Sequence, residues 1–216
     1  MIFVKNNDME DKFYKSSGIA LMIGSFLLVA TMVLHPIGAD PASIMKIFNL
    51  AVFTHAMAIV AILFLGFGFL GLCKFLKDRY GFSSFAYVSL VMALIAGMFA
   101  GTINGLVIPF FVKKMVDMGQ TNIDNIVKFA FIFNKCLDYI LVSGMSLAIL
   151  IWSLLMINKK VFPTYLGYFG VLFNVAFLIG LAINFDYSTL TGFSVFVFAM
   201  VVWVVSTGYL LSKEKS

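Results

Sequence analysis

The sequence predicts an all-α polytopic membrane protein, a bundle of six transmembrane helices, from its composition and its hydropathy. Of its 216 residues, 62% are hydrophobic and 12% are charged, and the mean hydropathy is +1.04. Soluble domains average about 45–50% apolar and about 25% charged residues. Runs of about 20 apolar residues can cross about 30 Å of hydrocarbon as a helix. These runs lack the alternation of apolar and polar residues that is typical of outer-membrane strands, which excludes a β-barrel.

Gaps between charged residues, together with turn-forming residues, divide the chain into six spans that form a single domain. The expected spans cover residues 17–35, 49–73, 84–112, 127–157, 165–183 and 189–211. The second helix is expected to begin earlier, because Asp40 before Pro41 is a favourable N-cap and first-turn pair, and Pro163 begins the fifth helix in the same way. The apolar run over residues 18–34 exceeds a usual signal-peptide core, so the first span is expected to be retained; cleavage after Ala39 is the alternative.

Lysine and arginine residues near the span ends predict that both termini are cytoplasmic. Ten lie in loops on the N-terminal side of the membrane, namely Lys5, Lys12, Lys15, Lys74, Lys77, Arg79, Lys159, Lys160, Lys213 and Lys215. Four lie in the opposite loops, namely Lys46, Lys113, Lys114 and Lys128. The His35–Pro36 pair, followed by His55 early in the next span, resembles small multipass proteins of bacteria. That resemblance covers two residues and implies no function; the expected location is a cell membrane, in a bacterium the inner membrane.

Polar side chains within the spans are the candidate functional residues, because a membrane makes them costly to bury. The expected ligand-binding residues are His35, His55, Asn104, Asn134, Lys135, Asp138, Asn184 and Asp186. At about 1.5 Å of rise per residue, His35, His55, Asn104, Asp138 and Asn184 lie roughly 27–32 Å from the cytoplasmic ends of their spans. The cytoplasmic halves are almost wholly apolar, and Asn174 lies near mid-depth. This pattern predicts a polar pocket that opens outward near the outer leaflet. The alternative is that each residue merely lies at the wet interface.

Spacing within the fourth span adds detail to this prediction. Asn134 and Asp138 stand four residues apart and share a helix face, while Lys135 and Asp138 stand three apart and can pair. Asp138 is therefore either a functional group that faces the bundle or one half of a structural ion pair with Lys135.

His35 and His55 could face one another across antiparallel helices. Two neutral imidazoles can ligate a haem iron or form half of a metal site, so haem or a metal ion is the cofactor hypothesis. A zinc ion would need further donors, for which Asp138 and Asp186 are the candidates. Against haem, no CxxCH attachment motif is present. His35 could instead bond a loop carbonyl at the interface.

Two glycine patterns lie within the expected spans, and the first is interpreted as a coincidence of small residues. Gly66, Gly68 and Gly71 spell GxGxxG, but this motif binds dinucleotides only after a strand, and here it lies inside an apolar helix. Gly97, Gly101 and Gly105 form a row that lets another helix approach closely. That row serves either the bundle itself or a homo-oligomer.

Three functions remain open. We favour a non-enzymatic binding or redox accessory subunit that holds a small or lipophilic ligand, because no catalytic set is complete. The second is a small-solute or ion transporter or channel, with Asp138 as the coupling group. The third is an intramembrane hydrolase or transferase that uses Asp138 and a histidine as its base. The lipid bilayer is the expected partner, and the scattered lysines exclude nucleic acid.

Overall fold

The computed structural model describes residues 2–38, 40–120, 122–187 and 189–214, and all of its regular structure is helical. Six helices in these ranges are long and apolar enough to cross a membrane, which confirms the predicted multipass helical fold. The elements are α1 (Ile2–Val33), α2 (Pro41–Lys46), α3 (Phe48–Phe75), α4 (Phe82–Thr102), the π-helix η1 (Ile103–Val107), α5 (Ile108–Asp117), α6 (Asp124–Lys159), α7 (Thr164–Ala182) and α8 (Leu190–Leu211).

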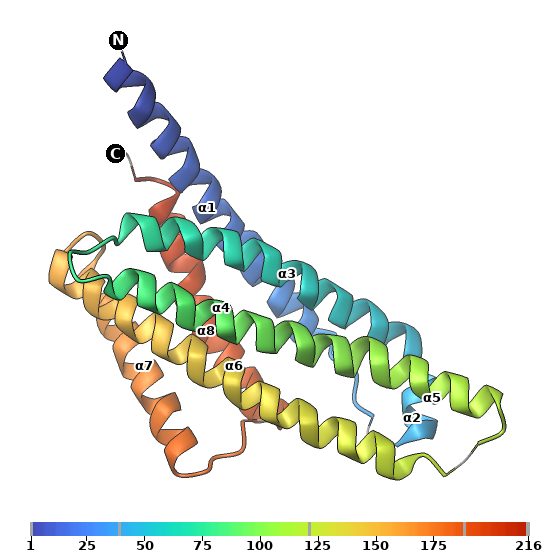
Figure 1. Cartoon of the computed structure of the whole chain (residues 1–216). Coiled ribbons are helices and arrows are strands. Elements are labelled where there is room, and N and C mark those ends of the chain that lie inside the picture. Colours follow the sequence, from blue (N-terminus) through green and yellow to red (C-terminus); the bar gives the residue numbers. More distant parts are fainter. Residues whose placement is uncertain (1, 39, 121, 188, 215–216) are drawn as a thin grey trace.

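The spans pack in the order α8, α1, α3, α4, α6 and α7 (Figure 1). α1 lies along both α3 and α8, and α4 lies along α6. The start of α1 and the end of α8 lie at the same end of the bundle, as an even number of spans requires. The cytoplasmic location of that end stays a prediction.

Two of the three glycines in the GxGxxG pattern lie at the contact between α1 and α3. A Cβ atom added to Gly71 would overlap the side chain of Ser17, and one added to Gly68 would lie 2.6 Å from Cγ of Leu21. Glycine is therefore required for the backbones to approach this closely. The motif, interpreted from sequence as a coincidence of small residues, thus places Gly68 and Gly71 in a packing surface against α1.

The region between the first two spans differs from the expected helix bounds. α1 ends at Val33 instead of continuing to His35, because a residue before proline is disfavoured in the helical conformation. Asp40 is an N-cap as predicted, and its carboxylate accepts from the backbone N–H of Ser43 at 3.0 Å. However, the helix that it begins is the separate α2, which Ile47 divides from α3. The alternative of cleavage after Ala39 falls outside the described residues.

The third span is one long helix whose regular geometry is interrupted at η1. Proline lacks an N–H, and its ring clashes with the carbonyl oxygen four residues earlier in an α-helix. Pro109 stands four residues after Gly105, so the wider π turn over Ile103–Val107 relieves this clash. The interruption also sets the orientation of Asn104, which lies within it.

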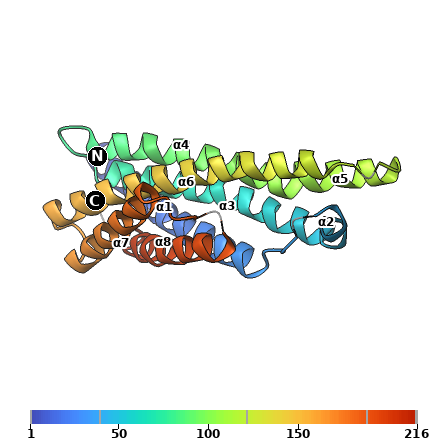
Figure 2. The same ribbon diagram turned by 90° about the horizontal axis from the view of Figure 1, so that it is seen from below.

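α5 and the first turns of α6 extend beyond the length that a membrane requires. α6 has 36 residues and is therefore about 54 Å long, against about 30 Å of hydrocarbon. A separate apolar cluster joins these turns to α2, which lies at the same end of the bundle (Figure 2). Its buried residues are Ile44, Ile108, Val112, Ile123 and Val127.

The half of the bundle expected to be almost wholly apolar contains buried polar groups. The indole N–H of Trp152 donates to Oγ of Ser83 at 3.0 Å, and that hydroxyl donates to the carbonyl of Cys73 at 2.9 Å. Ser153 and Asn174 are also fully buried. Serine and tryptophan are uncharged and scarcely lower a hydropathy average, so the sequence did not reveal these groups, whereas Asn174 was recognised near mid-depth.

The Asp78→Ala variant tests the loop between α3 and α4. The Asp78 carboxylate accepts hydrogen bonds from the backbone N–H groups of Tyr80 (2.9 Å), Phe82 (3.1 Å) and Ser83 (2.7 Å). Losing a capping group of this kind costs about 1 kcal/mol, so we expect the unfolding temperature at pH 7 to fall by about 2–4 °C. Asp117→Ala, at an exposed position in α5, is the control, and equal unfolding temperatures for the two variants would contradict this role.

The pH dependence of this stabilisation follows from the pKa of Asp78. Partial burial raises the pKa of Asp78, but the three backbone hydrogen bonds outweigh this effect and hold it below its ordinary value. A lowered pKa stabilises the fold above the unfolded-state pKa of about 4, and the gain disappears as pH falls through the folded-state value. The difference between wild type and Asp78→Ala should therefore shrink below about pH 4 in thermal unfolding scans.

Candidate ligand-binding cavity

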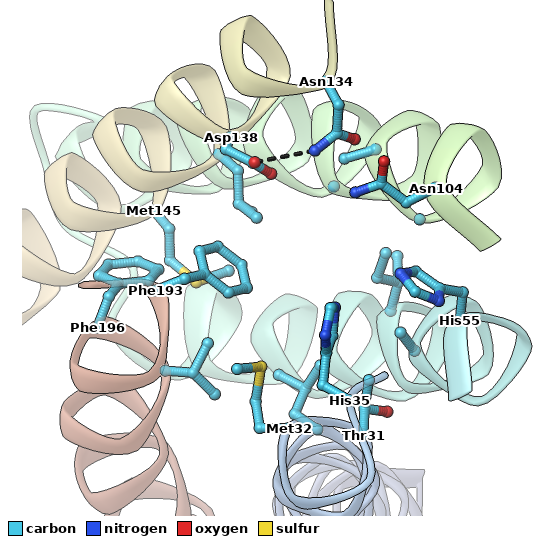
Figure 3. A pocket seen from close by; sticks show the side chains of 18 of the residues that line it. Thr31, Met32, His35, His55, Asn104, Asn134, Asp138, Met145, Phe193 and Phe196 are labelled. Atoms are coloured by element: carbon cyan, nitrogen blue, oxygen red, sulfur yellow. Dashed lines mark hydrogen bonds between the residues drawn. The ribbon is translucent and has the colours of Figure 1, made fainter. Parts of the chain in front are cut away.

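A cavity of about 490 Å³ lies within the bundle, enclosed by residues of α1, α3, α4, η1, α6 and α8 (Figure 3). Its walls are mainly apolar, with residues that include Leu28, Met32, Ile62, Leu65, Leu94, Met145, Phe193, Phe196 and Met200. Its polar lining residues are Thr31, His35, His55, Asn104, Asn134, Lys135 and Asp138. The cavity thus has a polar region beside a larger apolar one.

Six of the eight predicted site residues line this cavity; Asn184 and Asp186 do not. Asn184 instead terminates α7. Its φ is +60°, its N–H donates to the carbonyl of Leu181 at 3.1 Å, and the next N–H, of Phe185, donates to Gly180 at 2.8 Å. These two bonds form a Schellman motif, in which asparagine commonly takes the left-handed position. Asn184 was thus wrongly grouped with the polar residues of the spans, because it lies just beyond the end of its helix.

Lys135 and Asp138 do not form the ion pair that their spacing allowed. The ammonium of Lys135 lies 2.7 Å from the carboxylate of Asp186, in the loop between α7 and α8. A long lysine side chain can reach toward the membrane surface, where both partners remain about 40% exposed. Asp138 accepts instead from Nδ2 of Asn134 at 3.0 Å. Asn134 and Asp138 therefore lie on one helix face, as predicted, and are hydrogen-bonded to each other.

The amide orientation of Asn134 follows from this hydrogen bond. A carboxylate oxygen only accepts, so the Asn134 atom that faces Asp138 is its nitrogen, and Oδ1 is directed elsewhere. That oxygen is buried without a hydrogen-bond partner, and so is Oδ1 of Asn104. Figure 3 shows both amides and Asp138 on one side of the cavity, opposite the two histidines.

His35 and His55 lie beside one another, as predicted, with ring centroids 5.2 Å apart. Nδ1 of His55 lies 2.8 Å from the carbonyl oxygen of Ala51, which can only accept. Nδ1 therefore carries a proton. At pH 7, above the ordinary imidazole pKa of about 6.5, the neutral form predominates, and in that form Nε2 keeps a lone pair. Burial lowers the pKa of His35, so this ring is also neutral at pH 7.

The described residues do not assemble the predicted set of metal donors. No three histidine, cysteine, aspartate or glutamate side chains in that part of the chain lie close enough to share an ion. Asp186 is bound to Lys135 and lies outside the cavity. His35 and His55 alone remain as hypothetical ligands of a haem iron or a metal ion.

Gly105 places His55 against the π turn. A Cβ atom added to Gly105 would overlap Cβ of His55, whereas one added to Gly101 would lie 3.6 Å from Ile59, an ordinary contact. Of the predicted glycine row, Gly105 thus serves packing within the bundle, between η1 and α3. A homo-oligomer through this row stays a prediction.

The apolar part of the cavity was not predicted from sequence. Phe193, Phe196 and Met200 of α8 face it together with Met145 of α6. In a span that is apolar on every side, no residue type distinguishes a cavity wall from a lipid-facing surface. These positions could only be recognised once the helices were placed beside one another.

Gly105→Ala and Gly101→Ala form a matched pair that tests the contact with His55. The methyl group at residue 105 must displace α3 or η1, and overpacking of this kind costs about 1–3 kcal/mol. We expect a clear fall in unfolding temperature in detergent for Gly105→Ala and a value near wild type for Gly101→Ala. If both variants unfold at the wild-type temperature, the close approach is absent.

Comparisons of the chain with protein-family models, with curated proteins and with solved structures found no match.

Proposed function

We propose that this chain is a membrane-embedded binding protein whose cavity holds a lipophilic small molecule with a polar head group. The observation that carries the proposal is the division of one cavity into a polar region and an apolar region. Small-molecule sites commonly measure about 300–1,000 Å³ and combine apolar walls with a few convergent polar groups. The cavity of about 490 Å³ falls within that range.

The dimensions of the cavity suit an elongated ligand. On α3 the lining runs from His55 to Leu65, ten residues, which corresponds to about 15 Å. On α6 it runs from Phe131 to Met145, or about 21 Å. Along both helices the cavity is therefore long enough for a head group at the polar end and a hydrocarbon tail that extends toward the middle of the bundle. A cell membrane is the proposed location.

The hydrogen bonds favour binding over hydrolysis. A carboxylate that assists a histidine base must lie within hydrogen-bonding reach of that histidine. In the described residues Asp138 is bonded to Asn134, and His55 is bonded to the carbonyl of Ala51. The polar groups thus line the cavity. Among the described residues, no hydrogen bond joins a histidine to a carboxylate.

Ala58→Phe tests the binding function, because it adds a ring to the cavity wall. Ala56→Phe is the matched control, since Ala56 is exposed on the same helix. We expect purified wild type and Ala56→Phe to carry a bound lipophile, about one molecule per chain, and Ala58→Phe to lose it. Organic extraction followed by mass spectrometry provides the measurement. An identical extract from all three proteins would reject the proposal.

A transporter is the second candidate, and the interrupted helix favours it. Discontinuous helices often form the binding sites of transporters, and η1 interrupts the third span at Asn104. A second cavity of about 60 Å³ lies toward α2 and shares His35, His55 and Asn104 with the main one. It lies between the main cavity and Ile44 of α2.

Proteoliposomes that contain a pH-sensitive dye test this second candidate. If Asp138 couples transport to protons, wild-type protein should accelerate acidification after a pH jump, and Asp138→Asn should slow it at least about tenfold. Equal rates with wild type, with Asp138→Asn and in protein-free vesicles would reject proton-coupled transport and leave the binding function in place.

A further inference from the structure

The geometry points to a cationic amine as the head group of the ligand, held by Asp138 together with Asn134 and Asn104. This inference rests on the proposed binding function and specifies the ligand class. The ligand is an amphiphile with a protonated amino group at the polar end and a hydrocarbon tail against the apolar walls.

The charges of the residues that line the cavity favour a cationic ligand. Lys135 is paired with Asp186 at 2.7 Å, His35 is neutral, and the neutral form of His55 predominates at pH 7. In the part of the chain that the structure describes, Asp138 has no cationic partner, and its hydrogen bond comes from an uncharged amide. An ionised carboxylate in apolar surroundings is costly unless a cation lies beside it. A cationic ligand provides that partner.

The unpaired hydrogen-bond acceptors in the cavity favour a ligand that donates hydrogen bonds. Oδ1 of Asn134 and Oδ1 of Asn104 are buried without a partner, and both are acceptors. The Asn134 side chain as a whole is only 6% exposed. Nε2 of His55, with its lone pair, is a further acceptor. An ammonium group has three N–H donors and no acceptor, so it complements this set.

Other common head groups fit less well. Phosphate, sulfate and carboxylate groups only accept hydrogen bonds, and each would place a negative charge beside Asp138. A hydroxyl group has a single donor and leaves the charge of Asp138 unpaired. The arrangement in Figure 3 therefore selects against anionic lipophiles, since Asp138 and both amides lie on the same side of the cavity.

Three amphiphiles with the same twelve-carbon chain test this inference, namely dodecylamine, dodecanol and dodecanoate. Binding to the full-length protein in a neutral maltoside detergent is measured at pH 7, where the amine is protonated, by calorimetric titration. We expect dodecylamine to bind about 10- to 100-fold more tightly than dodecanol, because hydrogen bonds to charged groups are worth about 1.5–3 kcal/mol. Dodecanoate should bind most weakly.

Variants distinguish the role of the carboxylate from a general effect on the fold. Asp138→Asn keeps the shape of the side chain, so it should abolish the preference for the amine while dodecanol binding stays within about twofold of wild type. Asn104→Ala should weaken the amine about tenfold, and the surface change Asp117→Asn should alter nothing. An unchanged preference in both Asp138→Asn and Asn104→Ala would overturn the assignment of the head-group site.

The outcomes separate this inference from the function on which it rests. If all three compounds bind wild type equally, the cationic head group is wrong and the binding function stands. If none binds to wild type, while Ala58→Phe and wild type yield the same extracted lipids, the binding function itself fails.

Discussion

The close approach of η1 to α3, where Gly105 meets His55, is the contact on which the geometry of the cavity depends. Pro109 forces the π turn, the π turn sets the direction of Asn104, and the absence of a side chain at residue 105 lets His55 lie against the neighbouring helix. The bond from Nδ1 of His55 to Ala51 then directs the remaining lone pair away from its own helix turn. Without the glycine, the two helices would separate, and the polar residues of α3 and η1 would no longer border one space.

The charged residues of α6 face different surroundings. Lys135 and Asp138 lie less than one turn apart, yet they have different partners: Lys135 reaches Asp186 in a loop, and Asp138 faces the cavity with Asn134. Exposed ion pairs contribute little, typically about 0–1 kcal/mol, so the pair with Asp186 adds little stability. It also pairs the ammonium of Lys135 with a loop carboxylate and not with Asp138. The cavity consequently keeps a carboxyl group without an ion-pair partner and several acceptors.

The fold could be predicted from sequence because the membrane imposes it. Every backbone polar group must be satisfied within a helix, and each span must be long and apolar, so hydropathy, charge gaps and turn-forming residues located the six helices. The polar candidates were found in the same way, since His55, Asn104, Asn134 and Asp138 interrupt apolar runs. The errors involve side-chain reach and loop geometry: the partner of Lys135 comes from a loop 51 residues away, and Asn184 belongs to a helix end. Neither follows from spacing on a single helix.

The two regions of the cavity contribute differently to selectivity. A methylene group buried against residues such as Met145 and Phe193 is worth about 0.8 kcal/mol, so tails of similar length are discriminated only weakly. A buried polar group left unpaired costs about 1–3 kcal/mol, and more when it is charged. Asp138, Asn134 and Asn104 each impose such a cost on a ligand that cannot donate to them. In the proposed binding function we therefore expect selectivity to be set at the polar end, where α6 and η1 hold the acceptors on helical backbone, and the apolar end to accept a range of hydrocarbon tails.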